Sequence, residues 1–242
     1  MSEAYSTLAE WFEYLNADCD YEKWSQYLYA RLLESGIDRG KGMDIGCGSG
    51  VFTRALAKCG YDMTGYDVSA AMLSKAEQLG TGSRVRYVLS DARSIEVLGG
   101  KADFAVCVND CLNYIPPREV KKVMKRAASC LRKGGVFLFD VSSAYKLREI
   151  LGNNTFCEDR EELAYLWFNE LKRDRIEMDL TIFIKGKDGR FDRSDEHHTQ
   201  YIHERSDLEK AAAEAGFSVK KVEGEKGDAE DRTRLNFICV RE

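Results

Sequence analysis

Apolar and polar positions along residues 41–140 follow a repeating order of short apolar runs and longer segments with apolar residues at helical spacing. The apolar runs have the length of buried strands, and they predict strands at 41–45, 61–66, 84–89, 102–108 and 136–140. The segments between them predict helices. Strict alternation of strand and helix is typical of a parallel sheet with helices on both faces, so we expect an α/β fold.

The alternation breaks at residues 157–203. Apolar residues at every second position of 176–184 predict a half-buried antiparallel strand. The segment 163–171 can pair with it, and the turn signal Asp188-Gly189 leads into a further strand near 196–203. We therefore expect a small three-stranded antiparallel insertion that lies over the ligand edge of the main sheet.

Helices and a final pair of strands are expected at the two ends of the chain. The spacing Thr7 to Glu10 fits a capping box, and a second helix follows and ends near Gly36. Ser206 begins another capping-box pattern, whose helix ends at Gly216. Strands follow at 217–222 and 233–240. This gives three expected parts: N-terminal helices over 1–40, a main domain from 41–156 with 204–242, and the insertion 157–203.

The most informative stretch lies at the end of the first predicted strand. Glycines at 46, 48 and 50 allow a sharp backbone turn and let a ligand lie directly against it. The N–H groups of the following helix point toward that ligand. A dinucleotide-binding turn would place Gly or Ala at position 51, where this chain has Val51, and Asp44 precedes the first glycine by two residues. Both features argue against a nicotinamide site.

The run Asp44-Ile-Gly46-Cys-Gly48-Ser-Gly50 resembles the first motif of class I S-adenosylmethionine-dependent methyltransferases. Asp67 ends the second predicted strand, 17 residues after Gly50, where a carboxylate can accept hydrogen bonds from two ribose hydroxyls. The motif resemblance covers about residues 40–140. The wider pattern is similar to small bacterial-type methyltransferases that carry a β insertion after the fifth strand.

This resemblance implies a Rossmann-like, seven-stranded, mostly parallel sheet with an antiparallel last strand. It also implies S-adenosylmethionine as the cofactor. The residues expected at the cofactor are Tyr21, Trp24, Asp44, Gly46, Cys47, Gly48, Asp67, Val68, Asp91, Ala92 and Asn109. The residues expected near the methyl acceptor are Asp110, Tyr114, Tyr165, Trp167 and His198.

The expected activity is methyl transfer to an oxygen or nitrogen of a small molecule by in-line displacement. Because the cofactor carries the activated methyl group, the protein mainly positions and desolvates the acceptor. A base is needed only for a protonated acceptor, and a histidine that faces the crevice can serve. Two alternatives remain at this stage: an NAD(P)-dependent oxidoreductase, and a non-catalytic protein that binds S-adenosylmethionine or another nucleoside.

Composition and charge narrow the partners. The net charge of −5 argues against a surface that neutralises phosphates, so no nucleic-acid partner is expected. The eight cysteines form no Cys-x-x-Cys pair, and buried thiols in a reducing compartment explain them better than disulfides or a metal site. No apolar run has the length of a membrane span. We expect a cytoplasmic monomer or homodimer that binds no metal.

Overall fold

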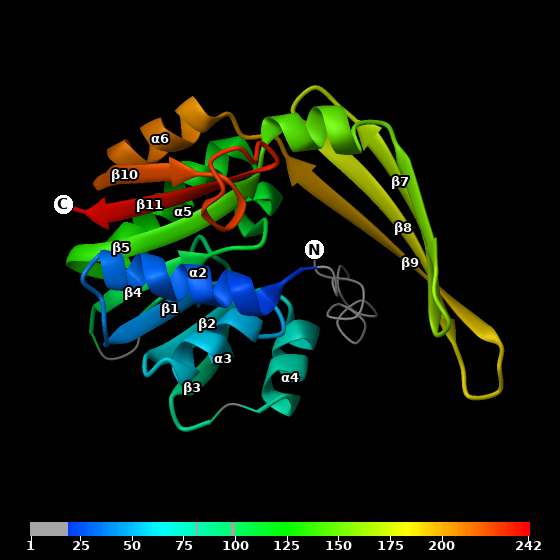
Figure 1. The fold of residues 1–242 in the computed structure, drawn as a ribbon, viewed down its shortest axis with the longest axis horizontal. Coiled ribbons are helices and arrows are strands. Elements are labelled where there is room, and N and C mark those ends of the chain that lie inside the picture. The colour runs from blue at the N-terminus through cyan, green and yellow to red at the C-terminus, as the bar shows by residue number, and fades with distance from the viewer. Residues whose placement is uncertain (1–18, 81, 98–99) are drawn as a thin grey trace.

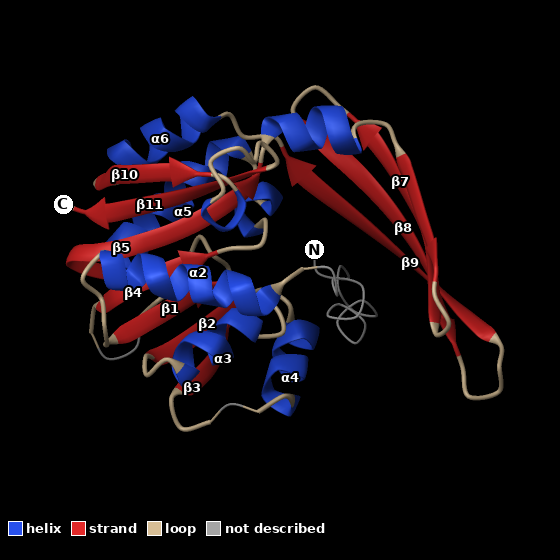
Figure 2. Cartoon of the chain, viewed as in Figure 1, coloured by secondary structure: helices blue, strands red, loops and turns tan. Residues whose placement is uncertain are grey.

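Two β-sheets organise the protein (Figure 1). The computed structural model describes residues 19–80, 82–97 and 100–242. The larger sheet has seven strands in the order β10-β11-β5-β4-β1-β2-β3, and the smaller has four in the order β6-β7-β8-β9. Figure 2 shows helices packed around the larger sheet, while the smaller sheet extends away from it as a long arm. The expected helix near Thr7 lies outside the described residues.

The larger sheet confirms the expected Rossmann-like topology. Its strands are β1 (Lys41–Ile45), β2 (Asp62–Asp67), β3 (Val85–Leu89), β4 (Ala102–Cys107), β5 (Leu131–Ser142), β10 (Phe217–Glu223) and β11 (Arg234–Arg241). Strands β1 to β5 pair in parallel, and β11 runs antiparallel to both β5 and β10. The order of the strands reverses between β1 and β4, because β2 and β3 lie on one side of β1 whereas β4 and β5 lie on the other. Ligands bind at such a point in open α/β sheets.

Helices cover both faces of this sheet because alternate residues of β4 point to opposite sides. Phe104 and Val106 pack with helices α2 (Tyr21–Glu34) and α3 (Val51–Lys58). Ala105 and Cys107 instead pack with α5 (Pro117–Cys130) and α6 (Arg205–Glu214). Helix α4 (Ala70–Gln78) lies against β2 and β3. All four β4 side chains are fully buried, as expected for a central parallel strand.

A side-chain cap begins one helix and is missing from another. The Ser69 hydroxyl accepts a hydrogen bond from the Met72 N–H at 3.3 Å, so Ser69 caps α4. Ser206 does not cap α6, because that helix already begins at Arg205 and Glu204 occupies the N-cap position. The capping-box spacing at Ser206 therefore misplaced the helix start.

The smaller sheet has four strands, so the expectation of three was wrong. Its strands are β6 (Thr155–Asp159), β7 (Leu163–Leu171), β8 (Arg175–Lys185) and β9 (Phe191–Tyr201). Strand β6 is short and rich in polar residues, and only its pairing with β7 identifies it as a strand. Strand β9 also begins before the expected residue 196, directly after the turn at Asp188-Gly189.

The alternating apolar row of β8 anchors the smaller sheet to the main domain. Ile176 and Met178 are buried against Leu147 and Leu151 of a π-helix, η2 (Lys146–Leu151), that follows β5. Further along β8, Ile182 packs with Leu163 of β7. We call the face of the sheet that carries this row the inner face. The inner face is thus attached at the end nearest the main domain.

A buried asparagine joins the main sheet to β9. Asn113 belongs to the short 3-10 helix η1 (Cys111–Tyr114) that follows β4. Its Nδ2 donates to the carbonyl oxygens of Ser142 at 3.2 Å and Tyr201 at 3.0 Å, and its Oδ1 accepts from the Ser142 N–H at 2.9 Å. One side chain therefore holds the end of β5, the loop after β4 and the end of β9 together.

Replacing Asn113 by Ala should destabilise the protein by about 1–3 kcal/mol, because buried backbone groups of Ser142 and Tyr201 lose their partner. Urea denaturation followed by circular dichroism measures this change. The exposed Asn154, which donates to the Ile150 carbonyl, provides the matched control, and its replacement by Ala should change stability by less than about 0.5 kcal/mol. Equal stability of the two variants would contradict the anchoring role.

Candidate active site

The glycine turn after β1 has the backbone geometry that its sequence predicts. Gly46, Gly48 and Gly50 all have positive φ angles, of 73°, 52° and 79°. Gly50 is also the N-cap residue of α3. A Cβ atom on Gly46 would lie 2.2 Å from the Sγ atom of Cys111, so the turn and η1 pack too closely for any side chain there. The turn and the loop after β4 thus form one compact edge.

Asp67 lies beside this turn at the end of β2. Its Oδ2 accepts from the Gly48 N–H and its Oδ1 from the Ser69 N–H, both at 2.8 Å. Burial raises the pKa of the Asp67 carboxyl, while these N–H donors oppose the shift. The next residue, Val68, is 62% exposed, and Leu89 at the end of β3 is 61% exposed. A carboxylate and two exposed apolar side chains therefore border the turn.

Asp44 is the buried carboxyl group beneath the turn. It accepts a hydrogen bond from the Thr53 hydroxyl of α3 at 2.5 Å. Burial raises the pKa of Asp44 to about 7; the Thr53 hydrogen bond opposes this shift and the negative charge of Asp67 adds to it. A cation bound nearby would favour the ionised form.

The loop after β4 begins with two residues in the left-handed backbone region, Asn109 at φ 61° and Asp110 at φ 65°. Such a conformation is strained for residues other than glycine, and packing must hold it in place. Asp110 accepts from the Ser142 hydroxyl at 2.9 Å and forms an ion pair with Arg234 at 2.5 Å. These contacts hold the loop against the ends of β5 and β11.

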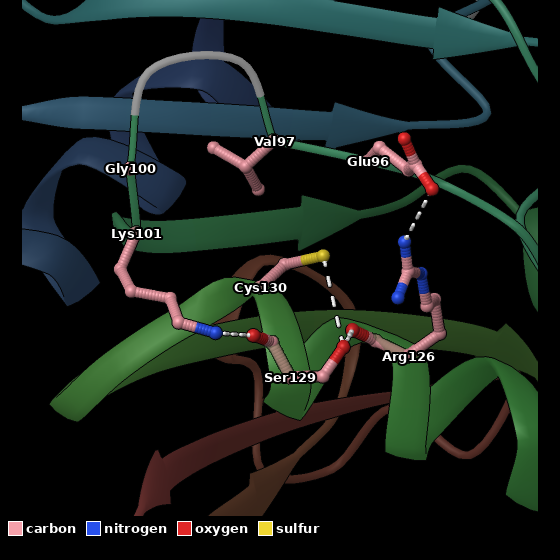
Figure 3. Close-up of a pocket in the computed structure, with 7 residues that line it drawn as sticks. All are labelled: Glu96, Val97, Gly100, Lys101, Arg126, Ser129 and Cys130. Carbon is pink, nitrogen blue, oxygen red and sulfur yellow. Dashed lines mark hydrogen bonds and ion pairs between the residues drawn. The ribbon is translucent and has the colours of Figure 1, made fainter.

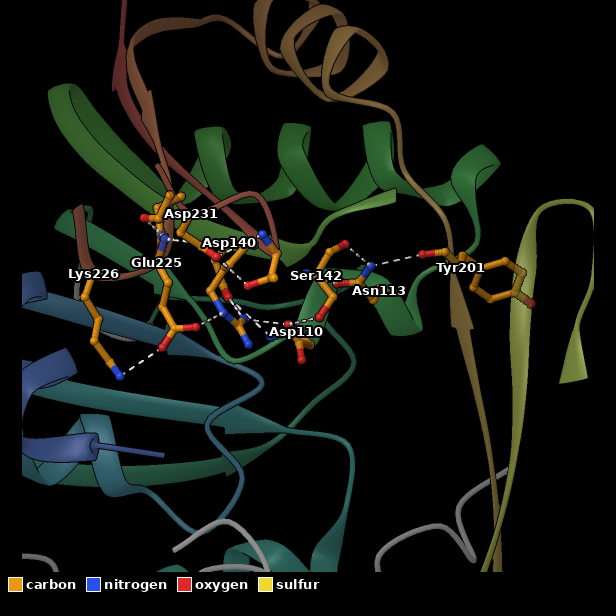
Figure 4. A network of polar contacts seen from close by, with 12 residues as sticks. Asp110, Asn113, Asp140, Ser142, Tyr201, Glu225, Lys226 and Asp231 are labelled. Atoms are coloured by element: carbon orange, nitrogen blue, oxygen red, sulfur yellow. Dashed lines mark hydrogen bonds and ion pairs between the residues drawn. The ribbon is translucent and has the colours of Figure 1, made fainter. Parts of the chain in front are cut away.

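Arg234 also pairs with Asp140, which is fully buried (Figure 4). Burial raises the pKa of Asp140 to about 6, although the Arg234 guanidinium opposes the shift. Burial acts in the same direction on Asp110, but there Arg234 prevails and the pKa of Asp110 is lowered. The guanidinium lies over the ring of Trp24, 4.6 Å from its centroid. One arginine thus connects α2, β4, β5 and β11.

The inner face of β9 brings a histidine toward the same edge. The Nε2 atom of His198 lies 3.1 Å from a carboxylate oxygen of Glu196, and both side chains are buried. The His198 ring meets the ring of Tyr114 edge-on, with 6.1 Å between centroids. Because Tyr114 and Cys111 belong to η1, a continuous set of contacts runs from His198 to the glycine turn.

Several predicted residues have partners within the protein. Trp24 is buried against Phe52, with 5.3 Å between ring centroids, and Tyr21 contacts the same ring at 5.7 Å. Asp91 binds the Arg93 guanidinium, which lowers the pKa of Asp91. The adjacent Ala92 is partly buried, and the turn residue Cys47 is buried.

Tyr165 and Trp167 lie on the inner face of β7, opposite Ile182 and Leu180 of β8. Trp167 packs against Phe156 at 5.6 Å between ring centroids and belongs to the small core under η2. Tyr165 packs in the neighbouring cluster around Ile182. Both rings therefore have packing partners on the inner face.

Sequence reasoning did not single out Arg234, Asp140 or Glu196. Asp140 carried a usable signal, because it stands near the end of a predicted parallel strand, at the ligand edge. Glu196 carried another, since it precedes His198 by two residues and must share its face of a strand. Arg234 carried none, because its partners lie 94 and 124 positions away along the chain.

Other features of the described residues do not form a second site of this kind. The hollow in Figure 3 lies near the start of β4 and contains none of the predicted residues; it is lined by Glu96, Val97, Gly100, Lys101, Arg126, Ser129 and Cys130. In the described part of the chain no cluster of three metal-ligating side chains occurs, and no helix has the length and apolar character to cross a membrane.

All eight cysteines are free. Cys59 and Cys157 are exposed, so the expectation of buried thiols fails at these two positions. Cys59 follows α3 as its C-cap residue, and Cys157 lies in β6.

Comparison with known proteins agrees with this geometry. The chain matches the methyltransferase-domain family over residues 13–222. A protein of Geobacillus sp. (strain WCH70), assigned to the methyltransferases by name, is 30% identical over 98% of this chain and 99% of its own. A crystal structure of an S-adenosylmethionine-dependent methyltransferase from Clostridium acetobutylicum superposes with a TM-score of 0.87, at 28% identity, over 96% of both chains.

A third similar structure is that of an S-adenosylmethionine-bound amino pentose methyltransferase from Micromonospora echinaspora. It superposes with a TM-score of 0.76 over 92% of both chains, and at 20% identity it supports the fold alone. The family match decides against the nicotinamide oxidoreductase and the non-catalytic binding protein. The chain belongs to the S-adenosylmethionine-dependent methyltransferases of class I.

Proposed function

We propose that this enzyme transfers the methyl group of S-adenosylmethionine to a small-molecule acceptor that is enclosed between the main sheet and the inner face of the smaller sheet. The observation that carries the proposal is the position of Asp67. Its carboxylate is tied to the Gly48 and Ser69 N–H groups, beside the exposed side chains of Val68 and Leu89. This arrangement suits a ribose with an adenine next to it.

The residues around the turn fit the remainder of the cofactor. Asp67 accepts hydrogen bonds from the ribose hydroxyls, and Val68 with Leu89 covers the adenine faces. Gly46 and Gly48 allow close approach of the ligand, while Asp44 and the Asn109 backbone favour a cationic group at the methionine end. When bound, the cofactor supplies an activated methyl group, so the protein needs to bind, orient and dry the acceptor.

The smaller sheet acts as the acceptor-binding lid. Its inner face is held to the main domain by the core under η2 and by Asn113, so it forms a wall rather than a loose flap. A wall of this kind excludes water from the methyl group that is transferred. It also suits a small, partly apolar acceptor better than a nucleic acid.

Replacing Asp67 by Ala should weaken S-adenosylmethionine binding about ten- to a hundred-fold, because a charge-assisted hydrogen bond contributes about 1.5–3 kcal/mol. Isothermal titration calorimetry measures the affinity. Asp62, at the other end of β2, is the matched control, since its side chain is 64% exposed and pairs with Arg84. Unchanged affinity in a folded Asp67 variant would remove the ribose role.

Titration with S-adenosylmethionine, its demethylated product and NAD tests the proposed cofactor directly. The first two should bind and NAD should not, because Val51 and Asp44 do not suit a pyrophosphate. Tight NAD binding would contradict the proposal.

Cofactor affinity should rise with pH up to about 7 and then level off. Burial raises the pKa of Asp44 to about 7, so the carboxyl is neutral below that pH. A cationic ligand favours the carboxylate, so binding at lower pH must release a proton, and affinity should fall up to about tenfold per unit below pH 7. In Asp44→Asn this slope should shrink, while the Thr53 hydrogen bond can be kept. An identical slope in the variant would exclude Asp44 as its origin.

Removing the lid should abolish methyl transfer and leave cofactor affinity within a few-fold. Residues 160–200 are replaced by a short Gly/Ser linker, which keeps Tyr201 bonded to Asn113 and His203 bonded to the Leu112 carbonyl. Circular dichroism checks folding, calorimetry measures cofactor binding, and labelled-methyl transfer measures turnover. Full activity of the shortened protein would contradict the lid.

A further inference from the structure

The inner face of β9 carries a polar pair that the cofactor site does not explain. Glu196 and His198 have side chains only 3% and 7% exposed, and they contact each other at 3.1 Å between Oε2 and Nε2. Burying a carboxylate is costly unless hydrogen bonds or an opposite charge compensate it. On a sheet face that otherwise carries an apolar row, such a pair is more costly than apolar packing would be. A function on the inner face would account for it.

The pair lies on the inner face of the smaller sheet, beside η1, rather than on its outer face. In the strand register His198 lies beside Met178 and Glu196 beside Leu180, both in the inner row of β8. The Tyr114 ring of η1 meets His198 at 6.1 Å between centroids. The first residue of η1, Cys111, packs against Gly46 of the cofactor turn. One short helix therefore separates the imidazole from the turn.

We infer that Glu196 and His198 form the acceptor site of this enzyme and that the acceptor is a primary amine, bound as its ammonium ion. This inference rests on the proposed small-molecule methyl transfer and specifies its substrate class. A buried carboxylate beside an imidazole attracts an ammonium group and repels carboxylate, phosphate or thiolate acceptors.

The same pair solves the chemical problem that an amine presents. An ammonium nitrogen has no lone pair and cannot attack until it loses a proton. His198 is the base that takes this proton, and Glu196, 3.1 Å from its Nε2, stabilises the resulting imidazolium. The amine nitrogen then forms a bond to the methyl carbon while the carbon–sulfur bond breaks. The electron pair of that bond stays on sulfur, and the imidazolium later returns its proton to water.

The outer face of the same strand provides a matched control. His197 is the neighbouring residue, but it lies on the opposite face of the strand and binds Asp179 at 2.7 Å and Glu177 at 2.9 Å. The side chain is 55% exposed, so its replacement should have little effect on folding. Comparing His197→Gln with His198→Gln therefore changes the same residue type on opposite faces of one strand.

The experiment measures methyl transfer from S-adenosylmethionine to a panel of primary amines, each paired with the alcohol of the same skeleton, such as glucosamine with glucose. We expect turnover with amines and not with their alcohols. Glu196→Gln and His198→Gln should lower kcat/KM for the best amine about 10²–10⁴-fold, whereas His197→Gln should stay within two- to three-fold. Calorimetric affinity for S-adenosylmethionine should be unchanged in all three variants.

Alkaline pH distinguishes proton removal from a purely structural role. The groups that face His198 include Glu196 from its own strand, Tyr114 from η1 and the uncharged Met178 from β8. A simple alkyl primary amine, the kind to use for this pH series, has a pKa of about 10, so its free-base fraction rises about tenfold per pH unit below that value. The deficit of His198→Gln should therefore shrink as pH rises from 7 to 9. A deficit that does not change with pH would contradict the base role.

The remaining outcomes separate this inference from the proposed function. Cofactor binding with turnover of alcohols, or with no amine of the panel methylated, overturns the amine assignment and leaves the methyltransferase proposal standing. Failure to bind S-adenosylmethionine overturns the proposed cofactor site itself. Equal losses in His197→Gln and His198→Gln would show that the strand, and not its inner pair, matters.

Discussion

The ion pairs of Arg234 with Asp110 and Asp140 are the constraint on which the edge formed by the glycine turn and the loop after β4 depends. One guanidinium serves two carboxylates that come from the ends of adjacent strands, and all three groups are largely withdrawn from water. Two neighbouring carboxylates would repel each other without it. Removing one member of a buried ion pair destabilises a protein far more than the net contribution of the intact pair suggests, because the remaining charge has no compensating partner. The strained backbone of Asn109 and Asp110 is held by the same contacts.

Two rigid anchors determine where the smaller sheet can lie. The core under η2 fixes one end of the smaller sheet through apolar packing, and Asn113 fixes β9 through directed hydrogen bonds. Apolar contacts tolerate sliding, whereas hydrogen bonds to named carbonyls do not. Together they define both the distance and the orientation of the inner face relative to the glycine turn. The long free portion of the arm, visible in Figure 1, lies beyond both anchors.

Local sequence signals predicted the features that one short segment determines. The glycine turn, Asp67 at the end of β2 and the parallel order of the first five strands each follow from spacing within a single strand–helix–strand unit. The Arg234 network joins segments far apart along the chain, so no local pattern announces it. Glu196 was hidden for a different reason. It lay within the expected strand 196–203 and shares a face with His198, but which face of the smaller sheet carries the inner row is settled by the pairing of β9 with β8.

The two adjacent histidines of β9 carry a consequence for how this family of sequences can change length. His198 is buried on the inner face beside Glu196, while His197 is exposed on the outer face beside two carboxylates. Because side chains alternate along a strand, deleting or inserting a single residue between His198 and Tyr201, whose carbonyl is held by Asn113, would exchange the two environments. Length changes by pairs of residues would preserve them. The turn at Asp188-Gly189 lies at the other end of β9, so its size can vary without this effect, whereas the stretch from His198 to Tyr201 can change only by even steps.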